Sequence, residues 1–209
     1  MENNTIREVE NNEEGYYGVG AFVLEMIKVV ILAVVIIVPV KAFLFQPFLV
    51  SGASMEPTFE NSEYLIVNEL GYNKVAPNFG DKNIFTINPF KDINRQTVIV
   101  FHYPKDPSQF FIKRVIGLPD EKIQIQDGKV TIYNAEYPNG FQLDETGYLS
   151  SLVKTKGDLT LTLRDDEYFV MGDNRSASSD SRAWGPIKKT DVVGSVLVRA
   201  WPLNRMNVF

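Results

Sequence analysis

The sequence of 209 residues contains no cysteine and a single histidine, His102. Without cysteine the chain can form no disulfide, no thiolate metal site and no cysteine nucleophile. One histidine also excludes a polyhistidine metal site, and we expect neither a metal nor another cofactor. The chain has 21 Lys and Arg against 26 Asp and Glu, a net charge of −5. Because it lacks the excess of positive charge that binds phosphates, nucleic acid is not an expected partner.

One long hydrophobic run is present, from Phe22 to Val50. Extended by one residue at its start, the segment 21–40 has about the length that crosses the hydrocarbon of a bilayer. Glu25 and Lys28 in this segment are spaced to pair on a helix. A cleavable signal peptide would have a basic start and a small-residue cleavage site, whereas residues 1–20 are acidic and no such site follows. We therefore predict an uncleaved transmembrane anchor at 21–40, after a disordered acidic tail at 1–20. A buried helix of a soluble protein is the alternative, and the few flanking Lys and Arg leave the orientation open.

Residues 41–209 consist of short runs of β-forming residues separated by turns. Asp127-Gly128 joins two of these runs, and this dipeptide is typical of a type I′ turn in a β-hairpin. The sequence therefore predicts a mainly β fold, a barrel or a sandwich, with one N-terminal transmembrane helix. A small insertion is expected at about 121–166. The predicted strands are 63–70, 83–89, 96–103, 109–118, 121–126, 129–134, 158–164, 167–172 and 192–201.

The stretch VSGASMEPTF contains Ser54, just after the hydrophobic run. A serine is a weak nucleophile unless a nearby group takes its proton. His102 lies at the end of a predicted strand, where a lone histidine is most often a surface residue. Lys113 lies in FFIKRVIGL, whose two alternating faces are otherwise apolar, and burial among apolar groups lowers the pKa of an amine. Lys113 is therefore a candidate base, although an edge-strand lysine that prevents aggregation would fit the same pattern.

A third segment, MGDNRSASSDSRAWGPI, follows another predicted strand and is rich in side chains that form hydrogen bonds. Loops of this kind often carry function, but a plain polar surface loop would have a similar composition. Charge-assisted hydrogen bonds could stiffen the loop. The side chains concerned are Asp173, Asn174, Arg175, Asp180 and Arg182.

Three stretches, FQPFLVSGASMEPTF, KRVIGLPDE and GDNRSASSDSRAWGPI, occur in this order after the hydrophobic run. Together they resemble the bacterial type I signal peptidases, membrane-anchored serine–lysine proteases that remove signal peptides from exported proteins. The resemblance covers most of residues 40–200. It implies a β-rich serine–lysine peptidase domain on the extracytoplasmic face of the plasma membrane, in contact with membrane lipid. It also implies exported preproteins with small residues at positions −1 and −3 as partners, with the secretion translocon as a further candidate partner.

Matched by position, Ser54 corresponds to the nucleophile of that family and Lys113 to its general base. Ser178 corresponds to a serine that orients the lysine amine, and Asp180 and Arg182 correspond to a structural ion pair of the loop. The resemblance further implies that the backbone N–H of Ser54 serves the oxyanion.

Two positions depart from the family pattern. Gly52 stands where some relatives have a serine hydroxyl as a second oxyanion donor, so this donor is missing or supplied otherwise. Asp120 stands where glycine is usual, so its turn must accept a Cβ. The positions that line shallow pockets for small side chains are matched by Phe48, Val50, Met55 and Ile112.

Two other functions fit part of the pattern. A self-cleaving serine–lysine peptidase of the repressor type would share the dyad, but the hydrophobic anchor and the lack of a DNA-binding module argue against it. A catalytically silent, membrane-anchored β-domain that binds exported partners would share the fold. Substitution of Ser54 distinguishes the silent domain from an enzyme, and a preprotein supplied in trans distinguishes the two enzymes.

Overall fold

The computed structural model describes residues 19–209 except 44, 73–77, 80–81, 84–85 and 87–88. The chain divides into two compact units, Met1–Val40 and Lys41–Phe209. Most of the predicted tail at 1–20 lies outside the described residues, and its last two residues already belong to a helix.

The helix α1 runs from Val19 to Phe43. Its segment Val19–Ile37 is 19 residues long and has a mean hydropathy of 2.6, and at 1.5 Å per residue this length approaches the roughly 30 Å of a bilayer's hydrocarbon. The expected pair is present, since Lys28 Nζ lies 3.0 Å from Glu25 Oε1. The protein therefore has an N-terminal helix that is long and apolar enough to span a membrane, close to the predicted position.

The second unit is mainly β, as the sequence predicts. Its largest sheet has the strand order β1-β2-β13-β5-β6-β11-β12, with β14 paired to β13. These strands are β1 (Phe45–Leu49), β2 (Tyr64–Asn68), β5 (Val98–Tyr103), β6 (Asp106–Gly117), β11 (Glu167–Met171), β12 (Ile187–Lys188), β13 (Val192–Trp201) and β14 (Asn207–Val208). The neighbouring strands pair antiparallel.

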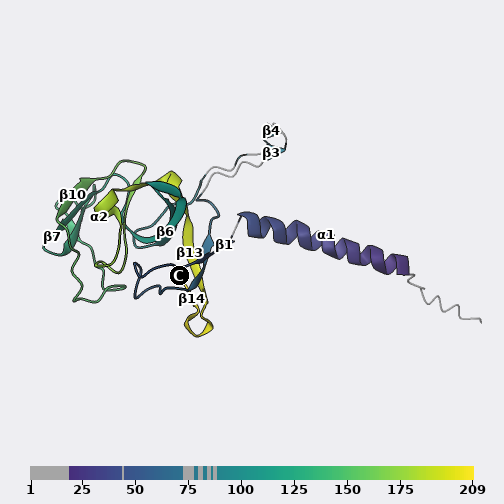
Figure 1. Ribbon diagram of the computed structural model, residues 1–209. Helices are drawn as coiled ribbons and strands as arrows, with labels where there is room; N and C mark the ends of the chain where they lie inside the picture. The colour runs from purple at the N-terminus through teal and green to yellow at the C-terminus, as the bar shows by residue number, and fades with distance from the viewer. Residues whose placement is uncertain (1–18, 44, 73–77, 80–81, 84–85, 87–88) are drawn as a thin grey trace, which may run out of the picture. The chain divides into compact units, whose positions relative to one another are not determined.

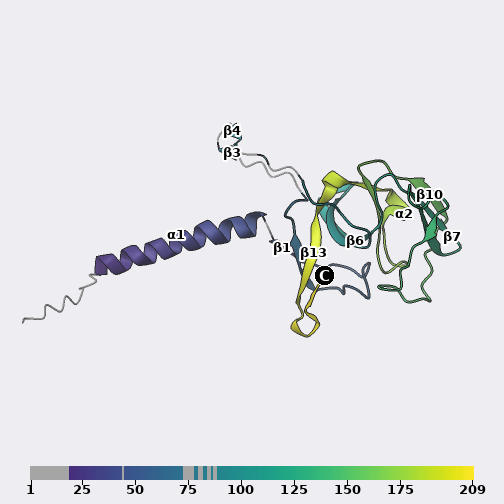
Figure 2. The same ribbon diagram turned by 180° about the vertical axis from the view of Figure 1, so that it is seen from behind.

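A smaller sheet has the order β10-β7-β8-β9. It contains β7 (Lys122–Gln126), β8 (Lys129–Tyr133), β9 (Phe141–Gln142) and β10 (Leu159–Thr162), while β3 (Asn78–Phe79) and β4 (Lys82–Asn83) pair with each other. Figures 1 and 2 show β7 and β10 at one end of this unit and β13 at the other, with β6 between them. The described helical turns are short: α2 (Ser181–Trp184), η1 (Lys189–Asp191) and η2 (Leu203–Arg205).

The predicted strands are found within a few residues of their expected bounds, apart from the one at 83–89, which lies mostly outside the described residues. The sequence did not indicate β1, β3, β9, β12 or β14. The last four have only two residues each, too few to show a period of two, and β1 contains Pro47 and lies within the long hydrophobic run.

Two turns behave as their residues require. Asp127 and Gly128 have φ of 53° and 79°, the two positive values of a type I′ turn, and they join β7 to β8 as predicted. Asp120 has a φ of 63°, in the left-handed region that favours glycine. The turn therefore accepts a Cβ where the family usually has none, and aspartate is among the residues that tolerate this region.

The strand β6 is central to the fold because it pairs with β5 on one side and with β11 on the other. Its last five residues, Lys113–Gly117, are all buried, as expected for a strand that is apolar on both faces. Ile112, Val115 and Ile116 each pack into a different one of the three hydrophobic clusters of the core. The strand that carries Lys113 is thus held in place by the whole core.

We expect residues 41–209 to fold without α1, because the three hydrophobic clusters draw all their members from Phe48–Val196. A chain that begins at Lys41 should show the β signal of circular dichroism and a cooperative thermal transition within a few degrees of that of the full chain in detergent. A non-cooperative transition would contradict this division of the chain.

Candidate active site

Ser54 lies in the turn-rich segment between β1 and β2 and is half-buried. Met55 and Phe59, which follow it, are 1% and 0% exposed and fasten this segment to the core. The Ser54 carbonyl oxygen accepts a hydrogen bond of 3.0 Å from the backbone N–H of Asn174. The segment is therefore held in place by two contacts: its packing against the core and its hydrogen bond to the loop after β11.

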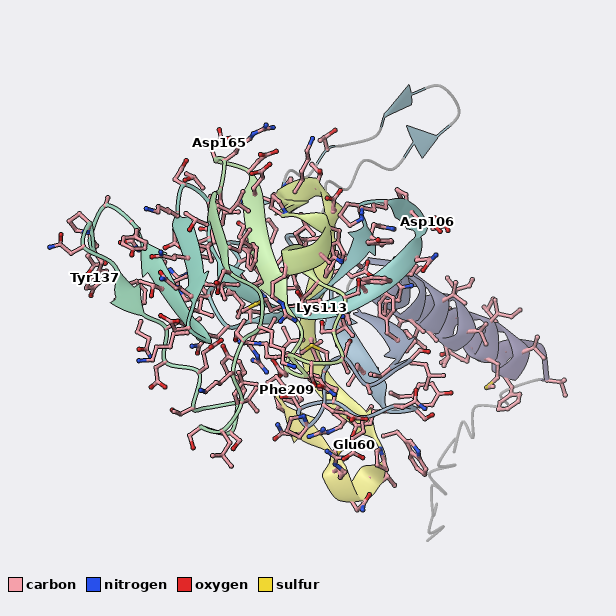
Figure 3. The ribbon with its side chains drawn as sticks, turned by 60° about the vertical axis from the view of Figure 1, so that its left-hand side comes forward. Glu60, Asp106, Lys113, Tyr137, Asp165 and Phe209 are labelled. Atoms are coloured by element: carbon pink, nitrogen blue, oxygen red, sulfur yellow. The ribbon has the colours of Figure 1, made fainter. Side chains whose placement is uncertain are left out.

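Lys113 reaches Ser54 from β6, 59 residues later in the chain. Its Nζ lies 2.8 Å from Ser54 Oγ and 2.8 Å from the carbonyl oxygen of Ile112. The side chain of Lys113 comes to the middle of the second unit in Figure 3, and the residue is 4% exposed. A serine hydroxyl in contact with a buried amine is an arrangement that can activate an oxygen nucleophile.

Burial lowers the pKa of Lys113 to about 8, while the carboxylates of Asp180 and Asp173 act in the opposite direction. The ring of Phe111 contributes to the burial, with its centroid 5.4 Å from the amine. A large fraction of the amines is therefore neutral near pH 8 and can accept a proton.

The carboxylate of Asp173 is held in a buried ion pair by the neighbour of Lys113 in sequence. Arg114 Nε and Nη2 lie 2.8 and 2.6 Å from the two Asp173 oxygens, and Thr58 donates a hydrogen bond to the same group. The Arg114 guanidinium also stacks 4.0 Å from the Tyr148 ring centroid. This contact was not foreseen, because the sequence suggested that Asp173 pairs within its own loop.

The rest of the loop contains a second and a third ion pair. Arg182 Nε lies 2.8 Å from Asp180 Oδ1, so the pair implied by the resemblance is present. Burial raises the pKa of Asp180, but hydrogen bonds and charge from Arg182 outweigh it and leave the pKa below its usual value. Arg175 pairs with Glu145, outside the loop, at 2.5 Å. The expected network exists, with partners recruited from other segments.

Ser178 lies next to this site, but it does not hydrogen-bond the lysine. Its Oγ is buried and has no partner of normal hydrogen-bond geometry among the described residues. A Cβ built on Gly172 would lie 2.3 Å from Ser178 Oγ and 2.4 Å from the Ser54 carbonyl oxygen. Ser178, Gly172 and Ser54 are therefore packed together, and the role of Ser178 toward Lys113 stays a proposal.

A cavity of about 450 Å³ opens beside Ser54. Phe48, Val50 and Ile112, three of the residues expected to line a pocket, do so. Met55 does not, because its side chain turns inward and packs in the core, and this expectation is corrected. Small residues that the sequence did not single out complete the lining, among them Ala53, Ala177 and Ser179.

The Ser54 N–H has no hydrogen-bond partner among the described residues and can donate to an oxyanion. Gly52 has a φ of +92°, and no atom lies within 4 Å of the place that a Cβ would take. Its N–H donates a hydrogen bond of 2.9 Å to Asn61 Oδ1. A serine here would be strained by this backbone.

His102 is engaged elsewhere. Its Nδ1 lies 2.7 Å from the Pro107 carbonyl oxygen, and its ring packs on Phe110 within the hairpin of β5 and β6. In the described part of the chain, no group of three His, Asp or Glu side chains is arranged to hold a metal ion.

The family model described as "Signal peptidase, peptidase S26" matches residues 23–201. The chain belongs to this family of signal peptidases. It is therefore a peptidase and a hydrolase by family.

Two curated relatives agree with this assignment. A probable signal peptidase I-2 of Synechocystis sp. is 31% identical over 185 residues, which cover 88% of this chain and 76% of that protein. A signal peptidase I of Bacillus amyloliquefaciens is 32% identical over 193 residues, with 88% and 91% covered. A crystal structure of a signal peptidase I from Enterococcus faecalis V583 is 32% identical and covers 50% of this chain and 97% of its own, with a TM-score of 0.41.

The close approach at Gly172 predicts that Gly172→Ala lowers activity about tenfold to a hundredfold, because a Cβ there must displace the Ser54 backbone or Ser178. The measurement is kcat/KM on a preprotein, with thermal unfolding to show that the variant is folded. Gly147→Ala is the matched control, since nothing lies within 4 Å of a Cβ at that position. Equal activity of both variants would contradict the packing described.

Proposed function

We propose that this chain is a membrane-anchored serine endopeptidase that cleaves N-terminal signal peptides from exported preproteins, with Ser54 as nucleophile and Lys113 as general base. The observation that carries the proposal is the distance of 2.8 Å between Lys113 Nζ and Ser54 Oγ, in a site where burial lowers the lysine pKa to about 8. Membership of the S26 family supports the same reaction.

In the proposed first step, Ser54 Oγ attacks the carbonyl carbon of the peptide bond and its proton passes to the neutral Lys113 amine. The resulting oxyanion accepts a hydrogen bond from the Ser54 N–H. The C–N bond then breaks as the Lys113 ammonium gives its proton to the leaving amine, which leaves an ester on Ser54. Water attacks this ester, Lys113 takes the proton of the water, and the proton returns to Ser54 Oγ.

Ser178 is proposed as a positioning residue for the lysine amine. Its buried Oγ forms no hydrogen bond of normal geometry among the described residues, and it lies near enough to Asp180 to help lower the pKa of that carboxyl. A small movement of the Lys113 amine toward Ser178 during the reaction would allow the hydroxyl and the amine to form a hydrogen bond. The loop that holds Ser178 is stiffened by the Asp180–Arg182 pair and the Arg175–Glu145 pair, which also limits how far Ser178 itself can move.

The proposed anchor is α1, with the β unit on the extracytoplasmic face of the plasma membrane and in contact with lipid. The strand β1 begins two residues after α1 ends, and Ser54 lies in the segment that follows β1. This short connection supports a site that works close to the bilayer, where exported preproteins leave the secretion translocon.

The proposed dyad predicts a rate that rises with pH and levels off, with a midpoint near pH 8, because the base acts when Lys113 is neutral. Ser54→Ala and Lys113→Ala should each lower kcat about 10³-fold or more. Lys113→Arg should fare no better, since a guanidinium keeps its proton in this range. Ser178→Ala should have a smaller effect than Ser54→Ala.

Initial rates between pH 5 and 11 on one purified preprotein give these values, and His102→Ala is the control that should stay close to wild type. A fully active Lys113→Ala, or an inactive but folded His102→Ala, would overturn the dyad. A wild type that cleaves the preprotein no faster than the background seen with no protein added would favour the catalytically silent binding domain instead.

The proposed substrates have small side chains at positions −1 and −3, since the cavity beside Ser54 is lined by Phe48, Val50 and Ile112 around small residues. Preproteins that differ in one residue should show a loss of about tenfold or more when Ala at −1 becomes Leu or Phe, because overpacking costs about 1–3 kcal/mol. The same change at position −2 is the control. Equal cleavage of the Ala and Phe preproteins at −1 would refute the pocket.

A further inference from the structure

A second cavity, of about 610 Å³, is lined by residues that follow Ser54 in the sequence and by two other segments. The first cavity is lined by the turn residues up to Ser54, whereas the second one begins at Glu56 and Pro57. Its opposite side is formed by the segment from Leu149 to Lys156, including the exposed lysines Lys154 and Lys156. None of these residues takes part in the proposed mechanism.

The second cavity borders the loop that is hydrogen-bonded to the Ser54 backbone. Asn174 contributes to its lining, and the backbone N–H of the same residue donates to the Ser54 carbonyl oxygen at 3.0 Å. An extended peptide that lies across Ser54 advances about 3.3 Å per residue. With the acyl side of such a peptide in the first cavity, its next few residues are within reach of Glu56 and Pro57, which follow Ser54 by two and three residues and line the second cavity.

Lys154 and Lys156 are presented by a segment that is fixed to the catalytic loop. Thr155 between them is buried, its N–H donates to the Gly128 carbonyl oxygen at 3.1 Å, and its Oγ1 accepts a hydrogen bond from Arg175. Both lysines are exposed and line the second cavity, and the aliphatic stem of Lys154 lies next to Gly128.

The charges around the second cavity leave these two lysines without a partner. Asp173 and Arg175 also line it, but they are paired with Arg114 and Glu145. Within the described residues, no ion pair is formed by either lysine. Among the described residues of the lining, the one further acidic residue is Glu56, which follows Ser54 by two residues in the sequence. The two lysines therefore carry unpaired positive charges in the far part of the cavity, and Lys154 also borders the neighbouring cavity that Asp127 and Asp144 line.

We infer that this second cavity binds the first residues of the mature protein, those that follow the cut bond, and that Lys154 and Lys156 favour acidic side chains there. The inference rests on the proposed function, because it takes Ser54 as the point where the peptide is cut. Exposed Leu152, 88% accessible beside the lysines, offers an apolar contact to the same segment. Exposed ion pairs are weak, so the two lysines together should change specificity by about threefold to tenfold.

The test uses full-length protein in an uncharged detergent and three soluble peptides with the same residues before the cut. The positions +2 to +4 after the cut are all Glu, all Ser or all Lys. Wild type should cleave the Glu peptide about fivefold better than the Lys peptide, through KM rather than kcat, and the preference should shrink in 0.5 M salt. The double variant K154E/K156E should reverse the order and leave cleavage of the Ser peptide unchanged.

Lys105→Glu is the matched control, because it changes the charge of an exposed lysine that lines neither this cavity nor the ones beside it. It should behave as wild type. An equal Glu-to-Lys ratio in wild type and the double variant, with the Ser peptide cleaved normally, overturns the inference and leaves the proposed function intact. A charge effect that appears only after anionic lipid vesicles are added also overturns it, since the lysines then contact lipid. Failure to cleave any peptide overturns the proposed function and this inference with it.

Discussion

The buried ion pair between Arg114 and Asp173 is the contact on which the arrangement of the site depends. Arg114 follows Lys113 in β6, Asp173 lies in the loop after β11, and Thr58 in the Ser54 segment donates to the same carboxylate. One desolvated charge pair thus ties together the three segments that supply the serine, the lysine and the loop. Removal of one partner of such a pair costs about 3–5 kcal/mol, because the other charge stays buried. The pairing also leaves Asp173 less able to hold the proton on Lys113.

A neutral lysine is obtained here at the expense of stability. The pKa of Lys113 falls from 10.5 to about 8 in the folded chain, so the unfolded chain binds more protons between these values. Below about pH 8 the folded state carries the whole penalty of a buried charge, about 3 kcal/mol by linkage. The penalty declines as pH rises and disappears above the pKa of the unfolded chain. The three clusters packed around β6 offset this cost, and an apolar residue at this position would be more stable but could not accept a proton.

The two sides of Ser54 differ in the chemistry they offer to a peptide. Among the described residues that line the cavity with Phe48, Val50 and Ile112, Lys113 is the one charged side chain, so this cavity can discriminate by shape. The cavity on the other side presents Lys154 and Lys156 on a segment pinned through Thr155, and it can discriminate by charge. A peptidase that must accept many mature sequences is served by this division, because shape complementarity rejects strongly and exposed charge only biases.

The sequence by itself determined the apolar helix, the hairpin at Asp127-Gly128 and the two-sided burial of β6, because these follow from local periodicity and turn chemistry. It also singled out Ser54 and Lys113 as candidates. The tertiary structure alone decided that these two meet, that Asp173 pairs with Arg114 and not within its loop, and that Met55 points into the core. Each of these depends on which distant segments become neighbours, here β6 beside β11 and the Ser54 segment against both, and that pairing is set by the packing of the whole core.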